Sequence, residues 1–130
     1  MPSKATARYI RISPYKVRRV LALIRGCDLE PALAALKFTP SAAAPLVHKV
    51  VSSAAANAEA NHGLRRERLF VQQAYADEGP RLRRFQAGSM GRGGIIRHRM
   101  THITVVLEER EAEGASPARR RRGAAPAARK

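Results

Sequence analysis

The sequence contains no tryptophan, a single cysteine, and only three tyrosines and three phenylalanines. Because one thiol cannot pair within its own chain, Cys27 excludes an internal disulfide and a CxxC metal knuckle. The scarcity of aromatic side chains argues against a platform on which single-stranded bases stack. No apolar run approaches the roughly 20 residues of a membrane span, and the first residues lack the hydrophobic region of a secretory signal. We therefore expect a chain kept in the cytosol or its equivalent, without a membrane partner.

Acidic residues are also scarce. The chain has 25 Lys and Arg against 10 Asp and Glu, which gives a formal net charge of +15. This excess is far larger than solubility requires, and it predicts a polyanionic partner bound mainly through its phosphates. The charge is also unevenly placed, because residues 1–27 and residues 79–107 contain basic side chains and no acid at all. Positive charge is thus predicted to belong to particular surfaces.

The length and composition predict one domain with appendages. We place this domain at residues 1–114. Residues 115–130 consist mainly of Ala, Pro and Arg and have almost nothing to bury, so we expect a disordered basic C-terminal tail. Two interpretations of the tail stay open, a solvated extension without a single partner and an ordered contact with nucleic acid.

A strand followed by a basic helix is predicted near the N-terminus. The segment ARYIRIS, residues 7–13, alternates apolar and polar side chains as a strand does. Ser13 is expected to cap a helix that starts at Pro14 and is closed by Gly26. Its apolar stripe consists of Val17, Val20, Leu21 and Ile24.

Two more helices are predicted before residue 63. Asp28 is expected to cap the first, with Leu29, Leu33 and Leu36 on its inner face. Ser41 is expected to open the second, which runs to about His62. The run SSAAANAEAN in this longer helix has small side chains that let another backbone approach closely.

Two further strands, LFVQQAYADEG at residues 69–79 and THITVVLEER at residues 101–110, enclose the segment RLRRFQAGSMGRGGIIRHR. A helix is disfavoured in this segment, because each of its four glycines costs roughly 1 kcal/mol relative to alanine. We predict a hairpin over residues 80–100 that turns near residues 88–94. Since its arginines cannot be buried in the protein's own core, the hairpin must project toward a negatively charged body outside the chain.

Catalytic and metal-binding interpretations are weaker. GSMGRGG lacks the Lys and Ser or Thr of a Walker-type phosphate loop. His98 and His102 would aim at one zinc ion on a helix, but on a strand they lie about 13 Å apart. Asp77 and Glu78 point to opposite faces of a strand, which does not suit acid and base work on one bond. We predict no enzyme, no metal site and no cofactor.

Five segments in sequence order carry a family resemblance: RYIRISPYKVRRVLALIRG, SSAAANAEAN, LFVQQAYADEGPRLRR, GRGG and THITVVL. At these intervals the chain resembles the large-subunit ribosomal protein twenty-two family of bacterial type, over about residues 5–109. Gly88 departs from the family pattern, which usually has an arginine near this position. The resemblance implies an α+β fold in which three helices pack on a small, mainly antiparallel three-stranded sheet with a long protruding hairpin.

The resemblance also implies a place in the large ribosomal subunit, in a bacterial cytoplasm or an organelle, as a single copy among neighbouring ribosomal proteins. It implies a structural role: binding 23S ribosomal RNA, assisting assembly, and lining the polypeptide exit tunnel beside the nascent polypeptide. The expected tunnel residues are Ala87, Gly88, Ser89, Met90 and Gly91. The expected RNA contacts are Arg11, Lys16, Arg18, Arg19, Arg81, Arg83, Arg84, Arg92, Arg97 and Arg99. The alternative is a free-standing basic nucleic-acid-binding protein.

Overall fold

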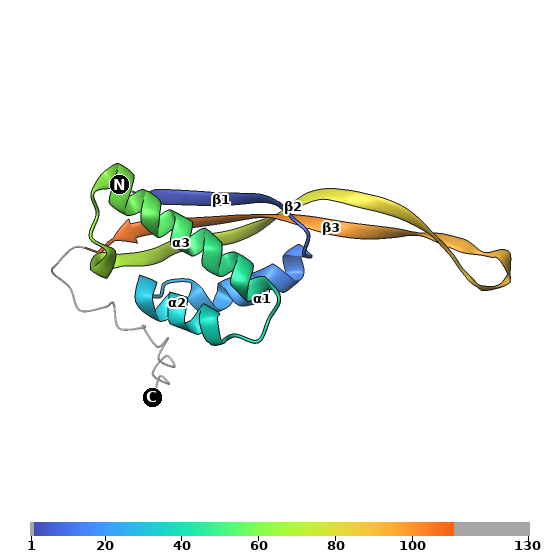
Figure 1. The fold of residues 1–130 in the computed structure, drawn as a ribbon, viewed down its shortest axis with the longest axis horizontal. Helices are drawn as coiled ribbons and strands as arrows, with labels where there is room; N and C mark the ends of the chain where they lie inside the picture. Colours follow the sequence, from blue (N-terminus) through green and yellow to red (C-terminus); the bar gives the residue numbers. More distant parts are fainter. Residues whose placement is uncertain (1, 111–130) are drawn as a thin grey trace, which may run out of the picture.

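The computed structural model describes residues 2–110, in which three helices cover one face of an antiparallel sheet and a two-stranded hairpin projects from one end (Figure 1). The predicted α+β class is therefore confirmed. The elements are β1 (Ser3–Ile10), α1 (Pro14–Ile24), α2 (Leu29–Phe38), α3 (Ala43–His62), β2 (Leu69–Ala87) and β3 (Gly93–Glu109). Short 3-10 turns occupy Arg66–Arg68 and Ser89–Gly91. The predicted tail, residues 115–130, lies outside the described residues.

The three strands have the order β1-β3-β2, so β3 is the central strand of the sheet. Its inward residues Ile103, Val105 and Leu107 are completely buried against the helices, as the alternation of the sequence predicted. The opposite face of the sheet has no helical cover in this part of the chain (Figure 1). A one-sided sheet of this kind places the hydrophobic core between β3 and the helices.

The first strand was predicted at residues 7–13, and this prediction is wrong at both ends. The strand β1 begins at Ser3 and ends at Ile10. Ser3 is buried, and its hydroxyl donates a hydrogen bond of 3.0 Å to the carbonyl oxygen of Ala54 in α3. At the other end, Tyr9 adopts a left-handed φ of 58° and the pairing with β3 shifts register between Ala7 and Ile10. This irregularity turns the chain out of the sheet before α1.

The helix α1 has the predicted limits and the predicted buried stripe. Ser13 and Asp28 stand at the N-termini of α1 and α2, but neither side chain makes a capping hydrogen bond. In α2 the inner face is formed by Leu29, Ala32 and Leu36, while the predicted Leu33 is only partly buried.

The helix α3 begins at Ala43, two residues later than predicted. The Ser41 hydroxyl oxygen accepts a hydrogen bond of 3.4 Å from the Ala43 amide just ahead of the helix. Buried alanines of α3, at 43, 44, 54, 55 and 58, allow its backbone to lie close to the sheet and to α2. No helix in the described part is long and apolar enough to cross a membrane.

The hairpin is formed by β2 and β3 themselves, which continue beyond the domain body as one ladder. Pairing runs from Leu69 with Glu109 to Ala87 with Gly93, and a register shift lies between Glu78 and Arg81. The predicted hairpin over residues 80–100 is confirmed, although the strands that flank it are not separate elements. At the turn, the Gly88 amide donates a hydrogen bond to the carbonyl oxygen of Arg92.

Candidate nucleic-acid interface

One side of the hairpin is an arginine face, which we define as Arg81, Arg83, Arg97 and Arg99. In the antiparallel ladder Arg81 pairs with Arg99 and Arg83 pairs with Arg97, so each pair lies on the same side. Like charges directly opposite each other destabilise a sheet. A carboxylate oxygen of Glu78 lies 3.3 Å from the Arg81 guanidinium, whereas Arg83 and Arg97 make no ion pair within residues 2–110. The arginine face therefore lacks most of the negative charge that would balance it.

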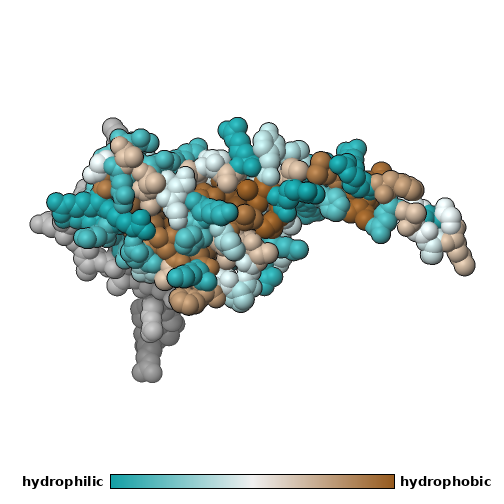
Figure 2. Space-filling view, viewed as in Figure 1, coloured by the Kyte–Doolittle hydropathy of each residue, from teal (hydrophilic) through white to brown (hydrophobic). Residues whose placement is uncertain are grey.

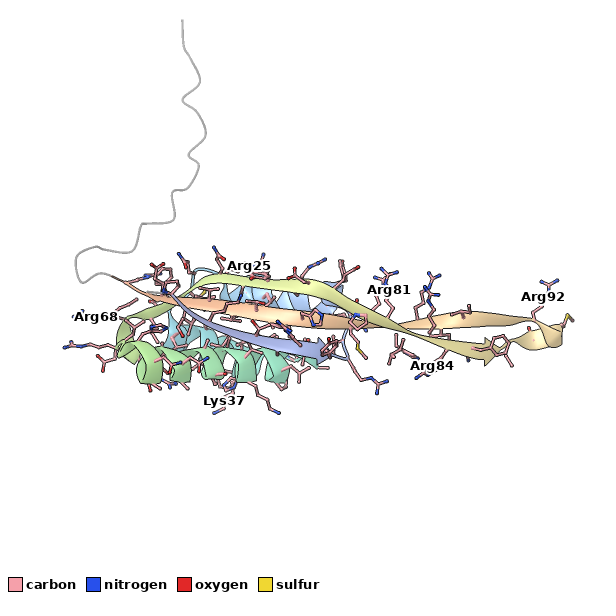
Figure 3. The ribbon with its side chains drawn as sticks, turned by 90° about the horizontal axis from the view of Figure 1, so that it is seen from above. Arg25, Lys37, Arg68, Arg81, Arg84 and Arg92 are labelled. Atoms are coloured by element: carbon pink, nitrogen blue, oxygen red, sulfur yellow. The ribbon has the colours of Figure 1, made fainter. Side chains whose placement is uncertain are left out.

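The other side of the hairpin is mixed in character. Leu82 pairs with His98 there, and Arg84 pairs with Ile96. Figure 3 shows Arg81 and Arg84 on opposite sides of the hairpin, as the alternation requires. The Arg84 guanidinium donates one hydrogen bond of 3.0 Å to the Arg83 carbonyl oxygen. This side thus combines positive charge with exposed apolar surface.

The hairpin tip consists of residues 87–91. Arg92 lies close to the turn (Figure 3). Met90 is 97% exposed and, with Gly91, adopts a positive φ. A Cβ atom at Gly88 would lie 2.8 Å from the Arg92 carbonyl oxygen. An arginine at position 88 would therefore require the backbone of the turn to move. The observed turn conformation thus favours glycine at this position.

A groove of about 860 Å³ lies where the hairpin leaves the body. Its walls come from three places: the start of α1, the segment between α2 and α3, and the base of the hairpin. Five of the predicted RNA-binding residues line it, namely Arg11, Lys16, Arg19, Arg97 and Arg99. The sequence predicted two basic surfaces, on α1 and on the hairpin, and the structure brings them together in one groove.

Arg18 has a different position from its neighbours on α1. Its guanidinium donates two hydrogen bonds, of 3.2 and 2.9 Å, to the carbonyl oxygen of Ala76 in β2. Arg25 likewise donates a hydrogen bond of 2.8 Å to the carbonyl oxygen of Ala74. Both arginines fasten α1 to the edge of the sheet. Helical periodicity places them outside the apolar stripe, but it cannot reveal that a strand edge lies beside them.

We expect Arg18→Gln to lower the stability of the protein and Lys16→Gln to lower its affinity for RNA. Arg18→Gln should lower the free energy of unfolding by about 1.5–3 kcal/mol, the range for hydrogen bonds made by charged groups. Lys16→Gln should change it by less than about 0.5 kcal/mol, because the side-chain hydrogen bonds from this part of the chain to β2 come from Arg18 and Arg25 and not from Lys16. It should reduce RNA affinity instead. Urea unfolding and filter binding measure the two effects. Equal stability of the two variants would contradict the structural role of Arg18.

The acidic residues gather mainly at the end of the body away from the hairpin. There Arg66 lies 2.7 Å from Glu30, and Arg110 lies 3.2 Å from Asp28. The hydrogen bond to Glu30 raises the pKa of Arg66. A guanidinium nitrogen of Arg68 also lies 4.0 Å from a Glu109 carboxylate oxygen. Carboxylates thus balance arginines at this end, and the groove and most of the hairpin stay positive.

The two histidines considered as zinc ligands lie on β3. Nδ1 of His102 accepts a hydrogen bond of 3.1 Å from the Tyr9 amide, and the two rings meet edge to face. His98 lines the groove. Within residues 2–110, no group of three or more His, Cys, Asp or Glu side chains is arranged to hold a metal ion. His102 has a structural role at the bulge of β1.

The fold and this surface define a class: a small α+β protein with a basic groove and a projecting arginine-bearing hairpin. Comparison with known families identifies the group within that class. The family model of ribosomal protein L22p/L17e matches residues 5–108, so the chain belongs to this family of ribosomal proteins of the large subunit.

Individual relatives support the same family. The chain is 53% identical over 111 residues to large ribosomal subunit protein uL22 of Thermoanaerobacter sp. (strain X514), covering 85% of this chain and 100% of the relative. It is 48% identical over 111 residues to the protein of the same name from Halothermothrix orenii, covering 85% of this chain and 98% of the relative. The expected family is thereby confirmed.

Proposed function

We propose that the chain is a structural constituent of the large ribosomal subunit that binds 23S ribosomal RNA through its arginine face and its basic groove. The observation that carries this proposal is the pairing of Arg83 with Arg97 across the ladder without a compensating acid in the described residues. Such a pair destabilises an isolated hairpin and is relieved when phosphates approach it. Arginine suits this role because its planar fork binds phosphate oxygens in a bidentate manner.

We further propose that the hairpin tip, residues 87–91, lines the polypeptide exit tunnel, and that the body assists assembly of the subunit. The tip is exposed and carries no charge of its own before Arg92, which suits a passage that must not bind a nascent polypeptide tightly. Neighbouring ribosomal proteins are the expected protein partners. The role needs no catalytic group, metal or cofactor. The bacterial relatives favour the ribosomes of a bacterial cytoplasm as its location.

Sedimentation tests this proposal. Tagged protein in a lysate should travel with the large subunit at moderate salt and should remain there at high salt, because a surface that fits folded RNA holds the protein even when salt weakens its phosphate contacts. A free-standing nucleic-acid-binding protein would instead travel with chromosomal DNA and leave it steeply as salt rises. Protein found free or with DNA in both gradients would overturn the ribosomal function.

A further inference from the structure

The groove between α1 and the hairpin base is lined from both sides of the hairpin, by Arg97 and Arg99 of the arginine face and by Leu82 and His98 of the other side. Besides its basic residues, the groove is lined by five apolar ones: Ile12, Val20, Leu23, Leu82 and Met100. Leu23 is 55% exposed, and Leu82 is half-buried. Figure 2 shows hydrophobic surface where the hairpin joins the body, among hydrophilic residues. A concave surface that combines apolar residues with a few charged ones is typical of a ligand site.

The charge of the groove restricts its ligand. None of the described residues that line it is acidic. Its basic residues come from α1 (Lys16 and Arg19), from the segment just before α1 (Arg11) and from β3 (Arg97 and Arg99). A ligand with negative charge is thus favoured, but an anion alone would leave the apolar walls in contact with water. The ligand should therefore carry a phosphate and a flat apolar part together.

A regular RNA duplex meets only half of this requirement. Its phosphates and 2′-hydroxyls lie outside, while its bases are paired and stacked inside. A duplex lying over the groove would satisfy the arginines and leave Leu23 and Leu82 uncovered. An unpaired nucleotide, by contrast, presents an apolar base face next to its own phosphates, and such bases stack on apolar side chains and on guanidinium planes.

We propose that the groove holds an unpaired RNA nucleotide turned out of its helix, with its base against Leu23 and Leu82 and its flanking phosphates bound by Lys16 and Arg97. The volume of about 860 Å³ lies within the range of sites that enclose small ligands. This inference rests on the proposed RNA-binding function and specifies what α1 and the hairpin base recognise together. Because the groove lies at the base of the hairpin, a nucleotide bound there would fix the direction in which the hairpin projects.

Three RNA probes test the inference with the full chain. The first is a 20-base-pair duplex, the second has one bulged uridine at its centre, and the third has an abasic bulge at the same place. We expect the protein to bind the uridine bulge about tenfold tighter than the other two, since only the uridine bulge offers an unpaired base that can stack on the apolar residues of the groove. Equal affinity for the uridine and abasic bulges would overturn the inference, because backbone flexibility would then explain the binding.

Two matched variants locate the effect. Leu82→Ser should abolish the preference for the uridine bulge, whereas Ile96→Ser, on the same side of the hairpin but outside the groove, should retain it. Thermal unfolding of each variant controls for loss of fold. A preference that survives Leu82→Ser, or that both variants lose equally, would overturn the assignment to the groove.

A photoreactive amino acid at position 82 gives a second readout in assembled subunits. We expect a crosslink to an unpaired nucleotide of ribosomal RNA. A crosslink to a neighbouring protein, to a paired nucleotide or to nothing would overturn the inference. These results are separable from the proposed function, because wild-type protein that sediments with the large subunit would still support that function.

Discussion

Replacing Arg81, Arg83, Arg97 and Arg99 together by glutamine is expected to weaken binding to 23S ribosomal RNA by roughly a thousandfold at 0.1 M salt. Each phosphate contact contributes a slope of about 0.7–0.9 to the dependence of log affinity on log salt. Four contacts thus account for about three decades between 1 M and 0.1 M salt. Because each pair places like charges across the ladder, neutralising them should not destabilise the protein. Filter binding over a salt series measures both the affinity and the slope.

A matched control separates location from net charge. Lys4, Lys37, Lys49 and Arg65 are exposed residues of the body, and replacing all four by glutamine removes the same charge. We expect this control to retain most of its affinity. An equal loss in both variants would show that the RNA responds to overall charge, and the arginine face would no longer be a specific surface.

The hairpin could be predicted from sequence because several local signals agree there. The glycines disfavour a helix, the flanking segments alternate, and the arginines exclude burial in the protein's own core. The buried stripe of α1 was predictable for the same reason, since a 3.6-residue period is a property of the segment alone. Such features depend on neighbours in sequence and need no knowledge of the tertiary structure.

The groove could not be predicted in this way. Whether Lys16 and Arg97 share a surface depends on the angle at which α1 meets the base of the hairpin, and no periodicity contains that angle. The bonds of Arg18 to Ala76 depend on the same packing. The early start of β1 was missed because Ser3 is polar, and its burial follows from a partner carbonyl in α3, 51 residues away.

The positions of the arginines along the ladder indicate different roles for the base and the tip of the hairpin. The arginine face lies near the body, at positions 81, 83, 97 and 99, whereas a single arginine, Arg92, lies beside the tip. RNA binding should therefore depend mainly on the base. The outer part, from Phe85 to Ile95, is exposed and contributes nothing to the buried core. Its removal should consequently leave both folding and RNA binding largely intact.

Shortening the hairpin tests whether the base binds RNA while the tip does not. Replacing residues 85–95 by Asn-Gly connects Arg84 to Ile96, which face each other in the ladder, through a two-residue turn of the kind that suits a hairpin. We expect the shortened protein to enter large subunits as the wild type does. If the tip lines the tunnel as proposed, its removal should change the response of the ribosomes to a macrolide antibiotic that binds in the tunnel severalfold. Sedimentation and minimal inhibitory concentration measure the two outcomes.

A second variant keeps the length of the hairpin and changes only residues 87–91 to glycine and serine. Since the arms would keep their length, its effect on the macrolide response should be smaller than that of the shortened hairpin. Failure of the shortened protein to enter subunits would mean that the outer arms, and Arg92 with them, anchor the protein to RNA. Normal assembly with an unchanged macrolide response would place the tip away from the tunnel wall. The two variants thus separate anchoring by the base from shaping of the passage by the tip.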